Sequence, residues 1–259
     1  MAFDREERAA SPPKADVGKR LQDLYLVGLG IDCRAHLTRE GEKALKQARV
    51  ILHIDEDHRW LRKLNPSVVD LKKMYWSGDE RLAVYERIRA RIITEMEGGP
   101  GVAFATYGHP MIFDRIANGL ISHCRQNGRS VRVVNGISSL DTLATDLGIE
   151  YGQGLQLYDA THVVTQAQPL NPRAHALLLQ IGEFGCSRTS NVIDRAAPRR
   201  YLPLIDHLKK FYPPSHRVTI AFSDNGEGLD LHPVPLSALD RHRQKIVPGA
   251  TLYIPPLPA

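Results

Sequence analysis

The sequence predicts an α/β protein with two domains, a first with a mostly parallel sheet and a second with an antiparallel component. Two patterns alternate along the chain: short apolar runs rich in β-branched residues, and segments in which apolar residues recur every three or four positions. Strands that alternate with helices form parallel sheets covered on both faces. The length of 259 residues favours two domains rather than one.

The first half of the chain contains apolar runs with the length and β-branching of buried strands, each bounded by Gly, Pro, Asp or Asn. They are LYLVG at 24–28, VILHI at 50–54, VAFAT at 102–106 and VRVV at 131–134. Helical periodicity separates these runs and follows the last one. The expected helices lie at 38–48, 82–96, 116–124 and 140–147. Ser138 and Ser139 can cap the last helix and leave backbone N–H groups for a ligand.

The pattern changes after a glycine-containing stretch at 147–157, which predicts the domain boundary. The two domains are expected at 23–148 and 149–259. Residues 1–22 are polar and lack apolar periodicity, which predicts a flexible N-terminal arm. In the second domain, the expected elements are strands at 176–182, 217–223 and 251–255 and a helix at 200–212 that Pro213 ends.

Charge and hydropathy exclude several classes of protein. The chain carries 34 basic and 29 acidic residues, and the basic residues are spread along it, so we expect no nucleic-acid partner. No apolar stretch approaches the ~20 residues that span a bilayer, so we expect no membrane partner. The polar start lacks the apolar region of a secretory signal, which predicts a cytoplasmic protein.

The cysteines and histidines predict no metal site. Cys33, Cys124 and Cys186 form no CxxC pair, which argues against a structural zinc site and against a disulfide framework. His53 and His58 lie five residues apart near two aspartates, a spacing that fits no common helical pair of ligands. We expect them on a surface loop and expect no bound metal.

Two glycine-containing loops follow expected strands. Gly28-Leu29-Gly30 follows the first, but Cys33 stands where a third glycine would complete the dinucleotide fingerprint, so the loop is interpreted as a tight turn. Tyr107-Gly108-His109-Pro110 follows the third, where Gly108 lets backbone approach a ligand and His109 offers a ring nitrogen. A plain loop is an equal alternative for this second motif.

A polar cluster is expected around the start of the helix at 82–96. If that helix begins near Asp79, Arg81 and Tyr85 are four residues apart on one face, and Tyr75 lies over its start. Two phenols around a guanidinium suit a functional site, and an arginine packed against surface tyrosines is the structural alternative.

These loops occur in an order that resembles the tetrapyrrole-methylase superfamily of S-adenosylmethionine methyltransferases, and within it the borosin-type peptide backbone α-N-methyltransferases. The resemblance extends from about Leu24 to Pro258 and includes Tyr75, Arg81 and Tyr85 at the family's spacing. The other motifs that carry it are LYLVGLGI, LNPSVVDL, YGHPMIF, GISSLDTLATDLGI, ALLLQIG and TLYIPP.

The resemblance implies two α/β domains with S-adenosylmethionine in the cleft between them and S-adenosylhomocysteine as the product. The implied cofactor-binding residues are Tyr107, Gly108, His109, Ile112, Phe113, Ser138, Ser139 and Gln180. The implied reaction chamber is lined by Tyr75, Arg81, Tyr85 and Tyr107. The implied assembly is a homodimer, or a heterotetramer with two precursor chains.

The sequence departs from this family at two places. Lys72 stands where relatives of the peptide-methylating branch carry another tyrosine. The chain stops at Ala259, whereas fungal relatives continue into their own substrate peptide, so the resemblance implies a separate precursor peptide that is methylated in trans.

Methylation of an amide requires activation, because its nitrogen lone pair is delocalised into the carbonyl. A nearby guanidinium favours a tyrosinate, so we expect Tyr75 to take the amide proton, and Arg81 with Tyr85 or Tyr107 to hold the charge on the amide oxygen. Two alternatives stay open at this point: a tetrapyrrole C-methyltransferase, and a protein that binds the cofactor or a peptide without catalysis.

Overall fold

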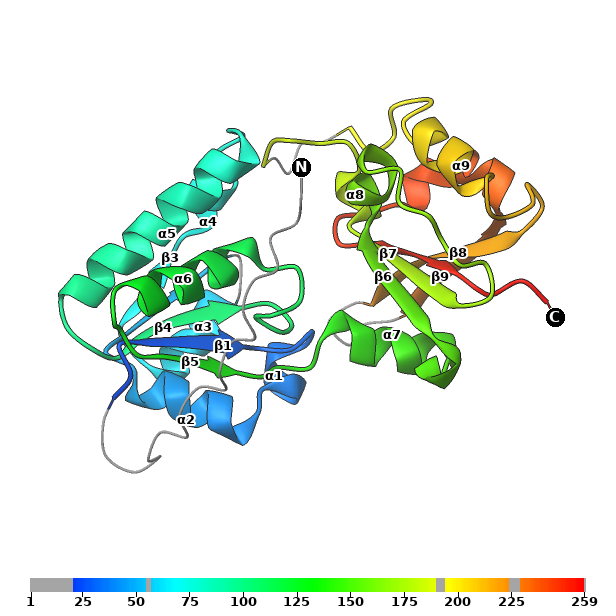
Figure 1. The fold of residues 1–259 in the computed structure, drawn as a ribbon. Helices are drawn as coiled ribbons and strands as arrows, with labels where there is room; N and C mark the ends of the chain where they lie inside the picture. The colour runs from blue at the N-terminus through cyan, green and yellow to red at the C-terminus, as the bar shows by residue number, and fades with distance from the viewer. Residues whose placement is uncertain (1–20, 55–56, 190–193, 224–228, 259) are drawn as a thin grey trace.

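The computed structural model describes residues 21–54, 57–189, 194–223 and 229–258. Within these ranges the chain forms two five-stranded sheets, each packed against helices (Figure 1). The predicted mixed α/β fold is therefore confirmed. Of the expected N-terminal arm, residues 1–20 lie outside the described residues.

The first sheet has the strand order β3-β2-β4-β1-β5, and all of its strands are parallel. Its strands are β1 Leu24–Gly28, β2 Val50–His53, β3 Val68–Asp70, β4 Val102–Thr106 and β5 Val131–Val134. The four strands expected here are present. The short edge strand β3 is an addition that the apolar runs do not predict.

Helices cover both faces of the first sheet because alternate strand residues point to opposite sides. Leu24, Leu26 and Phe104 pack against α5 Arg81–Glu97 and α6 Arg115–Gln126 on one face. Tyr25 and Val27 pack against α2 Arg39–Gln47 and α3 His58–Leu64 on the other. Two short helices, α1 Cys33–His36 and α4 Lys72–Tyr75, follow β1 and β3.

The second sheet is mixed and has the order β6-β7-β10-β8-β9. Its strands are β6 Leu155–Asp159, β7 His175–Leu179, β8 Arg217–Ser223, β9 Leu229–Pro235 and β10 Thr251–Ile254. β6 and β7 are parallel and the other pairs are antiparallel, as the expected antiparallel component requires. One face packs against α8 Ala160–Thr165, α9 Leu202–Leu208 and a 3-10 segment at Leu236–Lys245.

The helix α7 Ser139–Leu147 belongs by packing to the second sheet, although it follows the first in the chain. Its Leu143 is buried against Leu177, Leu179 and Tyr253. This packing favours a boundary before Ser139 rather than the expected one at 148/149, which stays a prediction. Further short 3-10 segments lie at Tyr151–Gln153 and Ile181–Glu183.

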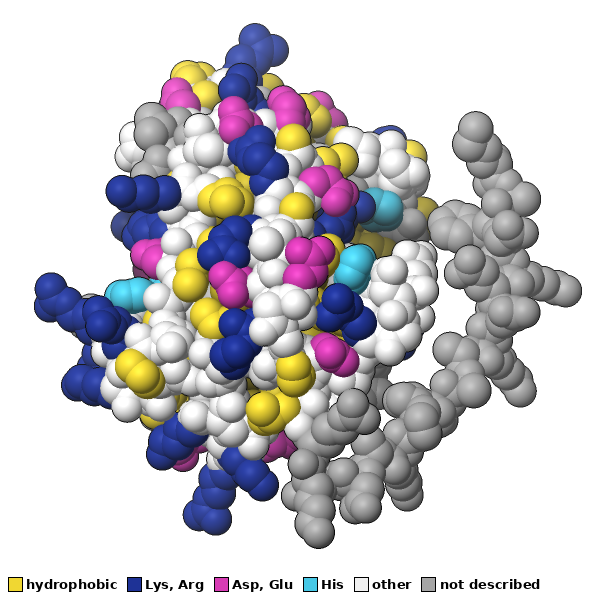
Figure 2. All heavy atoms as spheres, turned by 90° about the vertical axis from the view of Figure 1, so that its left-hand side faces the viewer, with side chains coloured by type: hydrophobic (Ala, Val, Ile, Leu, Met, Phe, Trp, Pro, Cys, Tyr) yellow, Lys and Arg dark blue, Asp and Glu magenta, His cyan; other side chains and the backbone are white. Residues whose placement is uncertain are grey.

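The surface on the side of α5 mixes charges of both signs. Figure 2 shows Lys and Arg side chains interspersed with acidic and apolar ones on this face. Arg87 pairs with Asp79 at 2.6 Å and Arg91 with Glu95 at 2.6 Å, so these two arginines of the helix have local acidic partners. Within the described ranges, no helix combines the length and the apolar composition that crossing a membrane requires.

Candidate functional site

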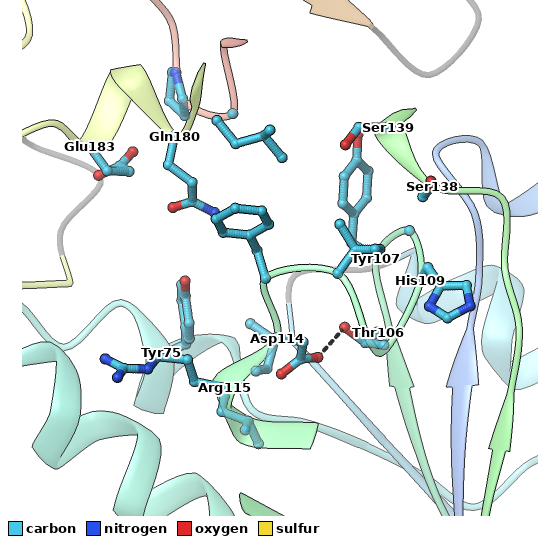
Figure 3. Close-up of a pocket in the computed structure, with 18 of the residues that line it drawn as sticks. Tyr75, Thr106, Tyr107, His109, Asp114, Arg115, Ser138, Ser139, Gln180 and Glu183 are labelled. Atoms are coloured by element: carbon cyan, nitrogen blue, oxygen red, sulfur yellow. Dashed lines mark hydrogen bonds between the residues drawn. The ribbon is translucent and has the colours of Figure 1, made fainter. Parts of the chain in front are cut away.

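A cavity of about 500 Å³ lies between the carboxyl edge of the first sheet and the second sheet. Figure 3 shows Tyr75 and Asp114 on one side of it and Gln180 and Glu183 on the opposite side. Every residue that the sequence named as a catalytic or cofactor-binding candidate lines this cavity. They are Tyr75, Arg81, Tyr85, Tyr107, Gly108, His109, Ile112, Phe113, Ser138, Ser139 and Gln180. The roles assigned to these residues stay proposals.

Three glycines bring the loops after β1, β4 and β5 together at the base of the cavity. A Cβ on Gly28 would lie 2.6 Å from the Gly108 carbonyl oxygen, and one on Gly136 would lie 2.3 Å from the same atom. Gly30 and Gly108 also exchange backbone hydrogen bonds of 3.2 and 3.0 Å. Only glycine fits this close approach at positions 28 and 136, which gives Gly28 a packing role in the turn after β1. The role of Gly136 was not predicted.

The loop after β4 presents several side chains to the cavity. Tyr107 is 49% exposed. The His109 ring is oriented by the Met111 N–H, which donates to its Nδ1 at 3.0 Å. Phe113 has a φ of +56° and Gln180, across the cavity, has a φ of +62°. Non-glycine residues rarely adopt this left-handed conformation and tend to do so at binding sites, where surrounding contacts hold them.

Ser138 uses its polar groups to begin α7. Its backbone N–H and its hydroxyl both donate to Asp141 Oδ2 at 2.7 Å, and its hydroxyl accepts from the Leu140 N–H at 3.2 Å. This capping box fixes the start of the helix against the cavity. The expected cap is present. Because the Ser138 N–H already donates to Asp141, it is not available to a ligand.

Tyr75, Arg81 and Tyr85 converge as the spacing predicts. The Tyr75 and Tyr85 rings are stacked with centroids 6.2 Å apart, and Trp76 meets Tyr75 edge to face at 4.8 Å. Tyr75 lies at the end of α4, and the other two residues lie in the first two turns of α5. The cluster therefore joins two helices at the cavity wall.

The electrostatics of this cluster differ from the expectation that Arg81 favours a tyrosinate. Burial raises the pKa of Tyr75 above its ordinary value, as does a hydrogen bond with Tyr85, and these effects outweigh the lowering effect of Arg81. Arg81 Nη2 also lies 3.7 Å from Glu183 Oε2, so part of its charge is compensated. Because its pKa is raised, Tyr75 is a neutral phenol at neutral pH.

The two sheets are linked at the rim of the cavity by a segment that the sequence did not mark. The Arg81 N–H donates to the Ser187 carbonyl at 2.8 Å, and the Thr189 N–H donates to the Asp79 carbonyl at 3.0 Å. Arg188 Nε donates to the Gly78 carbonyl at 2.7 Å. These bonds hold the start of α5 against the second half of the chain.

Two acidic residues in the cavity were also missed. Asp114 begins α6 by accepting from the Ala117 N–H at 2.8 Å, and it accepts from the Thr106 hydroxyl at 2.8 Å (Figure 3). Burial raises its pKa. An aspartate before a helical periodicity is a helix-start signal that could have identified Asp114. Glu183 pairs with Arg195 at 2.8 Å, and no sequence pattern around it identifies it as a site residue.

The prediction of a surface loop for His53 and His58 is wrong. His53 is 0% exposed and is the last residue of β2. His58 is the first residue of α3, and its Nδ1 lies 3.0 Å from His53 Nε2. The spacing of five arises because a strand end and a helix start, rather than one helix, carry the two rings.

Comparison with known proteins relates the chain to peptide precursor methyltransferases. It is 28% identical over 256 residues to a methyltransferase/ribosomally synthesized type I borosin cyclic peptide precursor of Coprinopsis marcescibilis, covering 96% of this chain and 64% of that protein. It is 28% identical over 246 residues to the corresponding gymnopeptides precursor of Gymnopus fusipes, covering 92% of this chain and 58% of that protein. The chain thus spans less than two thirds of these relatives.

Solved structures with the same fold include uroporphyrin-III C-methyltransferase from Thermus thermophilus. One matches with a TM-score of 0.64 and 23% identity, covering 90% of this chain and 91% of that one. Another, in complex with S-adenyl homocysteine, matches with a TM-score of 0.64 and 21% identity, covering 90% and 96%. A family model described as tetrapyrrole (corrin/porphyrin) methylases matches residues 23–223. Because that match covers well over half of the chain, the protein belongs to the tetrapyrrole methylase family.

Proposed function

We propose that this protein transfers methyl groups from S-adenosylmethionine to backbone amide nitrogens of a peptide. The observation that carries the proposal is the convergence of Tyr75, Arg81, Tyr85 and Tyr107 on one cavity. The names of the curated relatives, which join a methyltransferase to a borosin cyclic peptide precursor, support a peptide as the substrate. Phenols and a guanidinium suit a reaction in which a proton leaves nitrogen and charge develops on oxygen.

The cavity fits S-adenosylmethionine in size and lining. Its volume of about 500 Å³ lies within the range usual for small-molecule sites. Leu143 and Phe222 offer apolar surface for a flat base, and the carboxyl groups of Asp114 and Glu183 favour a cation. We propose that the 107–113 loop, the two serines at the start of α7 and Gln180 hold the cofactor. When bound, it supplies a methyl group attached to a positively charged sulfur.

The residues of this chain then have three tasks. The first is to hold the amide nitrogen ~3 Å from the methyl carbon, in line with the bond that breaks, and to exclude water. Trp76 packs edge to face on Tyr75 and covers part of the cavity wall. This packing keeps the phenol in one orientation toward the cavity.

The second task is to take the proton from the amide nitrogen. Tyr75 in its ionised form would accept this proton on its phenolate oxygen while the nitrogen lone pair forms the new bond to the methyl carbon, as the carbon–sulfur bond breaks and S-adenosylhomocysteine leaves. Because burial raises the pKa of Tyr75, the phenol must first give up its own proton. A positive charge brought into the cavity lowers the free energy needed for that ionisation.

The third task is to stabilise the amide oxygen as charge develops on it. Arg81, with Tyr85 or Tyr107, is placed at the cavity wall to donate hydrogen bonds there. The Glu183 carboxylate, 3.7 Å from Arg81, fixes the guanidinium at the cavity wall. Arg81 is therefore proposed to act by charge and orientation together.

The proposal includes the assembly expected from the sequence. The substrate is a separate precursor peptide, and the enzyme acts as a homodimer that binds one precursor chain per subunit. Size-exclusion chromatography with light scattering, with and without the peptide, measures both assemblies. A monomer that methylates the peptide would contradict this part of the proposal alone.

The test of the reaction is direct. The full chain is incubated with S-adenosylmethionine and a candidate precursor peptide encoded beside its gene, and the peptide is fragmented in a mass spectrometer. We expect mass increments of single methyl groups on backbone nitrogens, with one S-adenosylhomocysteine released for each. The Arg81→Ala variant serves as the negative control. Methyl groups found only on side chains would contradict the proposal.

A second candidate is C-methylation of a tetrapyrrole. The net charge of +5 would favour a polyacidic tetrapyrrole, which is the observation for it. The phenol and guanidinium cluster favours the peptide, because methylation at carbon needs no charge on an amide oxygen. A change in visible absorbance on incubation with a tetrapyrrole precursor, together with an unmodified peptide, would decide for this candidate.

A further inference from the structure

We propose that His53, His58 and Asp70 form a binding site for one divalent transition-metal ion of the Zn²⁺ type. The three side chains come from different elements: the end of β2, the start of α3 and the end of β3. Their possible ligand atoms all lie within 4.8 Å of one another. This inference does not rest on the proposed methyl transfer.

The sheet itself brings two of these residues together. His53 and Asp70 are paired in register in the parallel ladder between β2 and β3, so their side chains leave the sheet side by side. The Leu71 N–H donates to the His53 carbonyl at 2.9 Å and extends the pairing beyond β3. The Lys72 N–H donates to Asp70 Oδ1 at 2.7 Å, which fixes the carboxylate.

The third residue, His58, is held by the start of α3. Asp57 accepts from the Trp60 N–H at 3.0 Å and from Arg34 Nη2 at 2.7 Å, so its carboxylate is committed to the helix start and to a cation. These contacts set the position of His58, the next residue along. Supporting bonds of this kind orient metal ligands before the ion arrives.

The distances suit a small ion. His53 Nε2 and His58 Nδ1 lie 3.0 Å apart. In a tetrahedral site with zinc–nitrogen bonds of about 2.0–2.1 Å, two ligand nitrogens lie about 3.3 Å apart. An ion therefore needs only a small separation of the two rings, and it replaces the hydrogen bond that the neutral rings share.

The donor set selects the class of ion. Two imidazole nitrogens and one carboxylate oxygen suit Zn²⁺ and related transition metals, whereas Ca²⁺ and Mg²⁺ require mostly oxygen ligands. Three protein ligands leave a fourth position for water. His53 is 0% exposed and Asp70 is exposed, so the site opens to solvent on the carboxylate side.

Such an ion would join three elements next to the cavity. Ile54, directly after His53, lines the cavity, and β3 leads into α4, which carries Tyr75. The ion would therefore tie the end of β2 to the start of α3 and to the edge strand β3.

The experiment uses the full chain after treatment with a chelator and removal of any histidine tag. Co²⁺ is titrated while visible absorption is recorded, and Zn²⁺ is then added as a competitor. We expect saturation at one Co²⁺ per chain, loss of the absorption when Zn²⁺ is added, and a higher melting temperature with Zn²⁺. Mg²⁺ at the same concentration should have no effect.

The His58→Gln and Asp70→Asn variants should each weaken Co²⁺ binding at least tenfold and lose the Zn²⁺-dependent rise in melting temperature. Both residues are at least partly exposed, so these changes leave the core intact, and circular dichroism checks the fold. His162→Gln, at an exposed position of α8, is the matched control and should bind as the unaltered chain does. Absence of Co²⁺ binding by the unaltered chain, or undiminished binding by the two variants, would overturn the proposal.

Discussion

The pH dependence of methyl transfer tests whether Tyr75 is the base. At pH 8 a phenol with the ordinary pKa of 10.0 is about 1% ionised, and burial together with Tyr85 makes the tyrosinate fraction of Tyr75 smaller still. That fraction grows about tenfold for each pH unit below the pKa. If the tyrosinate takes the amide proton, kcat should rise with pH from about 7 upward and level off only at the pKa that Tyr75 has in the complex.

The assay is the initial rate of peptide methylation at saturating cofactor and peptide, followed by mass spectrometry between about pH 7 and 10. Removal of the hydroxyl by Tyr75→Phe should lower kcat by about 10²–10⁴, the usual contribution of a general base. The variant keeps the ring, and with it the stacking on Tyr85 and Trp76, so its folding and its cofactor affinity should be almost unchanged.

The matched control is Tyr151→Phe. Burial also raises the pKa of Tyr151, to about 12, but its hydroxyl donates to the Leu140 carbonyl at 3.3 Å and the residue does not line the cavity. This variant should keep both kcat and its pH profile. A flat profile in the unaltered protein, or a Tyr75→Phe variant within tenfold of its rate, would refute the assignment of Tyr75 as base.

Three further changes test other parts of the site. Arg81→Ala should lower kcat by about 10²–10³, the effect of removing one oxyanion donor, with a smaller effect on cofactor affinity measured by calorimetry. Gly136→Ala should lower the free energy of unfolding in urea by about 1–3 kcal/mol and weaken cofactor binding, because the new Cβ would lie 2.3 Å from the Gly108 oxygen; unchanged values would contradict the close approach. Burial raises the pKa of Asp114 in the folded protein, so its contribution to stability is lost as pH rises from the unfolded value of 3.8 through the folded one. Asp114→Asn keeps a capping side chain but cannot ionise, so urea midpoints from about pH 4 to 7 should fall less with rising pH than in the unaltered protein.

The strands that the sequence predicts and those it misses differ in their place in the sheets. The central strands β1, β2 and β4 are buried on both faces and therefore appear as continuous apolar runs. The three missed strands, β3, β6 and β9, are all edge strands. β6 reads LQLYD and β9 reads LDLHPVP, because an edge strand is half exposed and carries polar residues and proline.

In the candidate site, the sequence predicts contacts between residues that are near in the chain but not contacts between residues that are far apart in it. Tyr75, Arg81 and Tyr85 lie within eleven positions of one another, and helical spacing places Arg81 and Tyr85 on one face of α5. Glu183 meets Arg81 only because the second sheet lies across the cavity, and no periodicity reports that contact. The pKa of Tyr75 was misjudged for the same reason, since it depends on burial and on Glu183 as well as on the adjacent arginine.

The geometry of the cavity depends on the link between the two halves of the chain. Tyr75 and Arg81 come from the first sheet and its helices, whereas Gln180 and Glu183 follow a strand of the second. The hydrogen bond from Arg188 Nε to the Gly78 carbonyl joins residues 110 positions apart in the chain. Gly78 lies three residues before Arg81, which lines the cavity. A shift of the segment around Arg188 would therefore move the Arg81 guanidinium relative to Glu183. Because both groups affect the pKa of Tyr75, that pKa would change as well.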